Sequence, residues 1–264
     1  MSLVGAPRFA FLDHPGPIAF AHRGGAAERP ENTWASFSHA RNLGYRYIET
    51  DVHATTDGVV AVIHDPSLDR VSDRSGTVGE LAWSEVSRAR IDGTEPIPRL
   101  DELLATWPEL RWNIDAKHDA VVGPLVETLR RAGALERVCI TSFSDARIAR
   151  VRARGGPTLC TSTGPVAIGA LRLASVAPHL RWMIDRWKGA GATQVPLAWG
   201  PLPIIERHYV GFAHRAGLAV HAWTIHDEAV MERLLEEGVD GIMTDRPSLL
   251  KQVLIRRGVW VGTD

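Results

Sequence analysis

The chain has 264 residues, 45% of them hydrophobic and 23% charged, which is the composition of a globular protein and excludes a disordered one. The formal net charge of -1 argues against nucleic-acid binding, which depends on a basic domain or stripe. Cys139 and Cys160, the two cysteines, are too few for a disulfide framework and lack metal or redox spacing, so we expect both to be free and buried.

The N-terminal segment 1–16 lacks a basic start followed by an apolar core. Asp13, His14 and Pro15 fall where that core would lie, so we expect no signal peptide. No stretch reaches the ~18 apolar residues that a membrane-spanning helix needs. We therefore expect a cytoplasmic protein without an integral membrane segment.

Short β-rich apolar runs alternate with helical patterns along the chain, which predicts a parallel sheet. The run 59–63 is expected to extend the second strand region. Helices are expected at 32–43 and around the apolar stripes at 121–129 and 230–235, which are followed by glycines. The eight strands that we predict lie at 18–22, 47–52, 111–114, 138–142, 158–161, 193–196, 219–224 and 241–244.

Eight strand–helix units favour closure into a (β/α)8 TIM barrel over an open doubly wound sheet, and no G-x-G-x-x-G follows the first strand. We expect a single domain spanning 1–264. Segment 66–98 is polar, punctuated by glycines and longer than the roughly 2–6 residues usual for such a loop. It is therefore predicted to be a small insertion after the second strand, with helical turns around 83–89, which covers the mouth of the catalytic face.

Several strand ends carry acidic residues, which a buried strand would not normally hold. Glu49 and Asp51 are two positions apart and so share a strand face, as do Asp115 and Lys117 on the next strand. Three converging carboxylates would repel one another, and a divalent cation relieves this; all-oxygen ligands suit Mg²⁺ or Ca²⁺. The alternative is that Glu49 and Asp51 simply pair with Arg23 and Lys117.

His22 and His64 each end an apolar run close to this carboxylate cluster. A histidine pair suits acid–base work near neutral pH, and phosphodiester cleavage needs a base for the attacking oxygen and an acid for the leaving alkoxide. Arg23 and Lys117 are placed to hold phosphate oxygens, the arginine in a fork and the lysine as a point charge.

At this point the sequence resembles the glycerophosphodiester phosphodiesterase family over most of its length, although 145–190 adds little. The motifs that carry the resemblance stand in the family's order and spacing. They are Ala21-His22-Arg23-Gly24, Pro30-Glu31-Asn32-Thr33, Glu49-Thr50-Asp51-Val52, Asp57-Gly58, His64-Asp65, Leu68-Asp69-Arg70, Gly76, Trp223-Thr224 and Gly238-Val239-Asp240-Gly241-Ile242-Met243-Thr244-Asp245-Arg246-Pro247.

The resemblance implies a (β/α)8 barrel with an insertion after the second strand. It also implies hydrolysis of small-molecule glycerophosphodiesters to sn-glycerol 3-phosphate and an alcohol, in lipid and glycerol metabolism, with one divalent cation, Mg²⁺ or Ca²⁺. It gives roles to eight residues: the acid–base pair His22 and His64, the metal ligands Glu49, Asp51 and Asp115, and the substrate contacts Arg23, Lys117 and Trp223.

Two positions depart from the family pattern. The family usually has Glu-x-Lys on the third strand where this chain has Asp115-Ala116-Lys117, so the metal is expected to shift or to be reached through a water. The family often has Trp-Thr-x-Asn near the seventh strand, and here His226 replaces the Asn.

Two other functions stay open. A lysophospholipase D-type hydrolase on the same barrel would benefit from an exposed apolar rim, for which 199–204 is the candidate. A catalytically silent phosphate-binding barrel would be signalled by loss of a catalytic histidine or ligand, and neither is lost. The alcohol head group, the cation, the acid and base assignment and the oligomeric state are left open by the sequence.

Overall fold

The computed structural model describes residues 8–187 and 189–262. Of the segment 1–16, on which the expectation of no signal peptide rests, residues 1–7 lie outside the described residues. Among the helices that are described, none is both long and apolar enough to cross a membrane.

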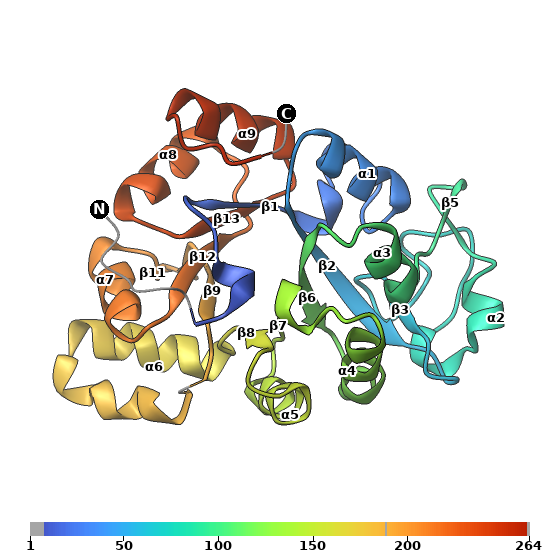
Figure 1. Ribbon diagram of the computed structural model, residues 1–264, viewed down its shortest axis with the longest axis horizontal. Helices are drawn as coiled ribbons and strands as arrows, with labels where there is room; N and C mark the ends of the chain where they lie inside the picture. The colour runs from blue at the N-terminus through green and yellow to red at the C-terminus, as the bar shows by residue number, and fades with distance from the viewer. Residues whose placement is uncertain (1–7, 188, 263–264) are drawn as a thin grey trace.

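Eight parallel strands form the centre of the molecule, with helices arranged around them (Figure 1). Their order is β8-β7-β6-β2-β1-β13-β12-β9, and a single bridge between Ser162 and Ala192 joins the two ends of this row. The predicted TIM barrel is therefore confirmed, and each strand falls on a predicted run. The strands are β1 (Ile18–Ala21), β2 (Tyr47–Ala54), β6 (Arg111–Ala116), β7 (Val138–Thr141), β8 (Cys160–Thr161), β9 (Ala192–Pro196), β12 (Ala219–Trp223) and β13 (Gly241–Thr244).

The helices pack their apolar faces on the outside of the sheet. In α4, Leu125, Val126 and Leu129 are buried at helical spacing, as the stripe predicts. Gly238 ends α8 in the left-handed conformation, with φ 89°, that glycine adopts without strain. The helices are α1 (Trp34–Asn42), α3 (Leu100–Thr106), α4 (Val122–Arg131), α5 (Asp145–Gly155), α6 (Pro165–Val176), α7 (Arg207–Arg215), α8 (Glu228–Glu237) and α9 (Pro247–Arg256).

Short elements complete the fold. The 3-10 turn Ala10–Leu12 places Phe11 against Phe20 and Tyr47, which fills the N-terminal end of the barrel. Cys139 and Cys160 are free, buried and directly opposite each other on β7 and β8. The remaining 3-10 helices are His22–Gly24, Val78–Glu80, Asp119–Val121, Leu135–Arg137 and Pro178–Trp187, and β10 (Ala198–Trp199) pairs with β11 (Leu202–Pro203) as a hairpin.

The insertion follows β3 (Val60–Val62), which pairs antiparallel with the end of β2. Segment 66–98 contains α2 (Trp83–Val86) and the small ladder of β4 (Arg90–Ile91) and β5 (Glu95–Pro96). Its apolar side chains form a cluster with those of the β3 region, separate from the main core. The segment lies to one side of the barrel (Figure 1).

Candidate active site

A cavity of about 160 Å³ opens at the C-terminal ends of the barrel strands. Strand parity and the strand-end positions place polar side chains there from several strands. Segment 66–98 contributes none of the described residues that line it, and its Arg70 binds Asp65, the neighbour of the lining residue His64. All eight residues singled out from the sequence line the cavity: His22, Arg23, Glu49, Asp51, His64, Asp115, Lys117 and Trp223.

The buried carboxylates come from two neighbouring parallel strands. Asp51 on β2 lies opposite Asp115 on β6, and Glu49 lies one pleat earlier on the same face as Asp51. The ammonium of Lys117 is 2.7 Å from Asp51 Oδ1 and 2.6 Å from Asp115 Oδ2. Lys117 therefore ties the two strands together by a pair of short ionic contacts.

Burial sets the charge state of this cluster. Burial and the nearby Asp51 raise the pKa of Glu49 to about 7, and burial raises the pKa of Asp115 as well. Burial also opposes ionisation of Asp51, but Lys117 and Arg23 outweigh it and hold the pKa of Asp51 below its ordinary value. The positive charge near Glu49 and Asp115 is therefore too small to offset the cost of burying these two carboxylates in the ionised form.

The buried carboxylates can be tested as ligands for the predicted cation. No group of three or more His, Cys, Asp or Glu side chains in residues 8–187 and 189–262 is already arranged to hold a metal ion, and Lys117 stands between two of the candidate ligands. Asp115 Oδ1, however, is buried without a hydrogen-bond partner among these residues. Because a buried oxygen without a partner is costly, the all-oxygen donor set of Glu49, Asp51 and Asp115 fits a divalent cation.

Arg23 lies near Oδ2 of Asp51, whereas Lys117 contacts Oδ1. Its backbone N–H donates to Glu49 Oε2 at 3.0 Å, and its Nη1 donates to Glu31 Oε1 at 3.0 Å. Its Nε is 3.4 Å from Asp51 Oδ2, is buried, and makes no hydrogen bond to any described residue. This free donor is suited to an anionic oxygen in the cavity.

Both histidines are oriented by carboxylates. His22 Nδ1 is 2.6 Å from Asp245 Oδ1, and His64 Nδ1 is 2.6 Å from Asp65 Oδ1. Since an ionised carboxylate only accepts, each Nδ1 carries the hydrogen and each Nε2 is left for proton transfer. Burial lowers the pKa of His22, but Glu49 and Asp245 outweigh it, so the pKa of His22 is raised.

The structure adds positioning residues to which the sequence gave no role. Asp245 stands immediately after the apolar run of β13, and Asp65 directly follows His64, which itself ends an apolar run. Asn32 donates from Nδ2 to Asp51 Oδ2 at 3.0 Å and accepts from Thr50 Oγ1 at 2.7 Å. It orients Asp51 from a left-handed backbone conformation, with φ 56°.

The two departures from the family pattern lie at this site. Asp115, in place of the usual Glu, is engaged by Lys117, while His226 Nε2 is 3.4 Å from the second oxygen of Asp245. Trp223 packs edge-on against Phe143, with ring centroids 5.6 Å apart, and Lys117 Nζ lies 5.8 Å from the centroid of the Phe143 ring. Phe143 also lines the cavity.

Comparison with known proteins agrees with this arrangement. The model of the "Glycerophosphoryl diester phosphodiesterase family" matches residues 22–249. The "Probable glycerophosphodiester phosphodiesterase 2" of Mycobacterium tuberculosis is 40% identical over 263 residues, covering 99% of this chain and 100% of the relative.

Two solved structures share the fold. A putative glycerophosphoryl diester phosphodiesterase from Silicibacter pomeroyi superposes with a TM-score of 0.79 at 23% identity, covering 96% of this chain and 100% of that one. An Oleispira antarctica phosphodiesterase, solved with the product sn-glycerol-3-phosphate, has a TM-score of 0.75 at 22% identity, over 90% and 97% of the two chains. With the family model matching most of its length, the chain belongs to the glycerophosphoryl diester phosphodiesterase family of enzymes.

Proposed function

We propose that the protein hydrolyses glycerophosphodiesters to sn-glycerol 3-phosphate and an alcohol, with His22 and His64 as the acid–base pair. The observation that supports this most is the pair of carboxylate-bound histidines in one cavity with Arg23 and Lys117. Each ring is fixed through Nδ1, and its Nε2 is the atom that exchanges protons with the substrate.

The reaction needs two proton transfers. A water oxygen bonds to phosphorus while the bond from phosphorus to the alcohol oxygen breaks. One histidine takes the proton of the water, and the other gives its proton to the departing alcohol, so that the net change is the addition of one water. Arg23, whose buried Nε lacks a partner among the described residues, and Lys117 hold the phosphate oxygens during this exchange.

We assign Glu49, Asp51 and Asp115 as the residues that would hold one divalent cation, Mg²⁺ or Ca²⁺. When bound, such an ion supplies Lewis-acid polarisation of a phosphoryl oxygen. In the protein alone, Lys117 pairs with both Asp51 and Asp115, which leaves their charges only partly balanced, and Arg23 donates its backbone N–H to Glu49.

Selectivity should follow from which half of the substrate meets the fixed groups. In this proposal Arg23 and Lys117 bind the phosphate and Trp223 packs beside the glycerol, whereas the alcohol lies at the open edge of the cavity. We therefore expect strict demand for glycerol phosphate and broad tolerance of the alcohol.

The deciding experiment compares kcat/KM for glycerophosphocholine, glycerophosphoethanolamine, glycerophosphoglycerol and glycerophosphoinositol, with Mg²⁺ and with Ca²⁺. Bis(4-nitrophenyl) phosphate, which lacks glycerol, is the control substrate. Fast cleavage of that control relative to all four glycerol substrates, or no hydrolysis with either cation, would contradict the proposal.

A second substrate class is favoured by exposed apolar side chains at and beside the cavity, which we call the apolar rim. Phe143 is 66% exposed at the mouth, and Val166 at the start of α6 is 66% exposed. Trp199 lies against α6 near Gly169, and Leu202, across the hairpin, is 69% exposed. This surface would receive the acyl chain of a lysophospholipid whose head-group phosphodiester occupies the cavity.

Replacing one rim residue separates the two substrate classes. We expect Leu202→Ser to lower kcat/KM for lysophosphatidylcholine about 10-fold, since burying a leucine side chain contributes about 1.5–3 kcal/mol, and to leave glycerophosphocholine hydrolysis unchanged. Ile255→Ser on α9, which changes an exposed apolar side chain outside this rim, is the matched control. Equal effects of the two variants on the lysolipid would remove the second substrate class.

A further inference from the structure

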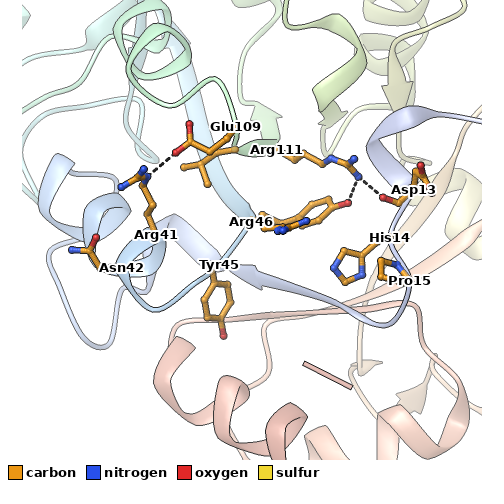
Figure 2. Close-up of a pocket in the computed structure, with 11 residues that line it drawn as sticks. Asp13, His14, Pro15, Arg41, Asn42, Tyr45, Arg46, Glu109 and Arg111 are labelled. Carbon is orange, nitrogen blue, oxygen red and sulfur yellow. Dashed lines mark hydrogen bonds and ion pairs between the residues drawn. The ribbon is translucent and has the colours of Figure 1, made fainter. Parts of the chain in front are cut away.

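A second and larger cavity, of about 860 Å³, lies at the N-terminal ends of the strands, at the opposite end of the barrel from the candidate active site. Figure 2 shows the side chains that line it. We call it the basal cavity. Three segments line it: 13–15 before β1, the turn between α1 and β2, and 109–111 before β6. It shares no lining residue with the candidate active site.

Arg111 is a fixed cation at one side of the basal cavity. Its Nη1 donates to the carbonyl oxygens of Asp13 at 2.6 Å and Phe11 at 3.2 Å, and to the hydroxyl of Tyr47. Its guanidinium also lies over the Tyr47 ring, 5.4 Å from the centroid. These partners are all uncharged, so they hold the guanidinium in place without neutralising it. Its Nε and Nη2 make no hydrogen bond with a side chain or backbone group of the described residues, so they are available to another acceptor.

Arg46 supplies a second uncompensated charge. Its side chain is exposed and makes no ion pair or hydrogen bond with any residue in the described part of the chain. Of the two carboxylates in the lining, Glu109 is bound to Arg41 at 2.7 Å, on the side away from His14 in Figure 2. The other, Asp13, is exposed beside His14 and does not pair with either Arg46 or Arg111.

His14, which also lines the basal cavity, lies close enough to both arginines to be affected by their charge. His14 lies edge-on to Tyr47, with ring centroids 5.4 Å apart, and contacts the Gly16 carbonyl oxygen through Nδ1 at 2.7 Å. Burial lowers the pKa of His14, and the nearby positive charges of Arg111 and Arg46 lower it further. The lining of the cavity holds three arginines, Arg41, Arg46 and Arg111, against two carboxylates, Asp13 and Glu109, so its net charge is positive with His14 counted as neutral.

We propose that the basal cavity binds the phosphate group of a small phosphate monoester, with Arg46 and Arg111 on the phosphate oxygens. Guanidinium groups match phosphate geometry through paired N–H donors, and a phosphate dianion balances two arginines where a carboxylate would balance one. The volume lies within the roughly 300–1,000 Å³ typical of small-molecule sites, so the cavity accommodates an organic group beyond the phosphate.

Position makes this site independent of the proposed hydrolysis. Tyr47 begins β2 and Arg111 begins β6, and the other ends of these strands carry the buried carboxylates of the candidate active site. The length of one barrel strand thus separates the sites. A ligand in one neither blocks nor completes the other.

The test measures binding of sn-glycerol 3-phosphate by calorimetry in an Arg23→Ala background, which weakens phosphate binding at the candidate active site. Glycerol is the uncharged control ligand, and ionic strength is held constant because salt screens such contacts. We expect one site that binds the monoester and not glycerol. Adding Arg46→Glu should weaken that binding at least ~10-fold, because the contact with phosphate becomes repulsive.

Arg233→Glu is the matched control, since it makes the same charge change on an exposed face of α8 without a described partner. Arg46 is exposed and carries no structural contact, so its replacement should leave the circular dichroism spectrum unchanged. Inorganic phosphate as a second probe should bind the same site and lose affinity with Arg46→Glu. Absence of binding in the Arg23→Ala background, or equal affinity in the Arg46→Glu and Arg233→Glu variants, would overturn the proposal.

Discussion

Each candidate catalytic histidine is held by a carboxylate that comes from close by in space, in one case far away in sequence. His64 is bound by its neighbour Asp65, whose carboxylate also accepts from Arg70 of the insertion. Arg70, followed by His64, lowers the pKa of Asp65 to about 2 against the effect of partial burial. His22 is bound by Asp245, which follows the last barrel strand. Both rings therefore have a fixed orientation before substrate arrives.

Removing either ring should abolish most activity without unfolding the protein. General acid–base groups typically contribute about 10²–10⁴-fold, so His22→Ala and His64→Ala are each expected to lower kcat by that range. His208→Ala, on the surface of α7, is the control. Steady-state kinetics and a circular dichroism spectrum check the result, and near wild-type turnover in either variant would exclude that histidine from the acid–base pair.

Asp245 should act through His22 and not on the substrate. Asp245→Asn removes a carboxylate that helps raise the pKa of His22, so the limb of the kcat/KM pH profile governed by His22 should move to lower pH, with a loss of rate. His226→Asn is the matched control, because His226 touches the other oxygen of Asp245 and leaves the bond to His22 in place. A profile that does not move in Asp245→Asn would contradict this positioning role.

Trp223 was expected in the cavity only from the family resemblance, whereas the other seven predicted residues that meet there were indicated by strand parity and strand-end polarity. They are local signals, and they are strongest where a charged residue interrupts an apolar run, as at Glu49 and Asp51. The bond from Asp245 to His22 spans 223 positions, so no local spacing indicates it. The position of Lys117 between two of the predicted metal ligands also depends on side-chain packing that parity does not determine.

At the scale of single elements, the start of α1 supports the site. Thr33 Oγ1 accepts from the Ser36 N–H at 3.1 Å, and Ser36 Oγ accepts from the Thr33 N–H at 3.1 Å. Each side chain thereby satisfies a backbone donor that the first turn of a helix leaves free. This cap fixes the residue before it, Asn32, which in turn holds Asp51.

Loss of that N-cap should measurably lower the stability of the protein. Thr33→Ala is expected to lower the free energy of unfolding by about 1 kcal/mol, the usual cost of an N-cap hydroxyl. Thr33→Ser retains the hydroxyl and should remain close to wild type. Urea unfolding of the three proteins checks this, and equal midpoints would show that the bond contributes nothing.

The strands were predictable because each is a short apolar run bounded by turn residues, and α4 and α8 because their apolar stripes are narrow. α6 was harder to predict because Val166, Leu173 and Val176 are exposed, so apolar residues occur on all its sides and the helical period is obscured. The insertion was recognisable by its length. Its packing beside β3 depends on tertiary contacts within its own small cluster.

For the whole molecule, the predicted cation should stabilise the fold. An ion that binds only the folded chain adds about 2.7 kcal/mol at 100 times its Kd. We expect Mg²⁺ or Ca²⁺ to raise the melting temperature of the wild type and to have little effect on Asp115→Asn, which weakens the donor set. Asp92→Asn, at an exposed turn, is the control. An equal shift in the Asp115 and Asp92 variants would place the ion elsewhere.

Acid should weaken the barrel through a histidine in its interior. Burial lowers the pKa of His221 to about 4, so the folded protein keeps this ring neutral while the unfolded chain protonates it near pH 6.5. Stability from this group is present above pH 6.5 and is lost as the pH falls towards 4, by about 3 kcal/mol. His221→Gln should have a flatter stability profile over that range in urea unfolding. If the stability of the wild type and of His221→Gln changed in parallel with pH, the lowered pKa of His221 would be contradicted.

The bridge between Ser162 and Ala192 has a consequence for where the barrel opens most easily. β8 has two residues, and the backbone bonds that join it to β9 among the described residues run from Gly191 N–H to Thr161 O and from Thr163 N–H to Ala192 O, each 2.9 Å. Thr163 Oγ1 adds a side-chain bond to Thr193 Oγ1 at 3.0 Å. Because fewer bonds must break here than between β2 and β6, we expect the backbone amides of this seam to exchange hydrogen with solvent sooner than those of the β2–β6 pair.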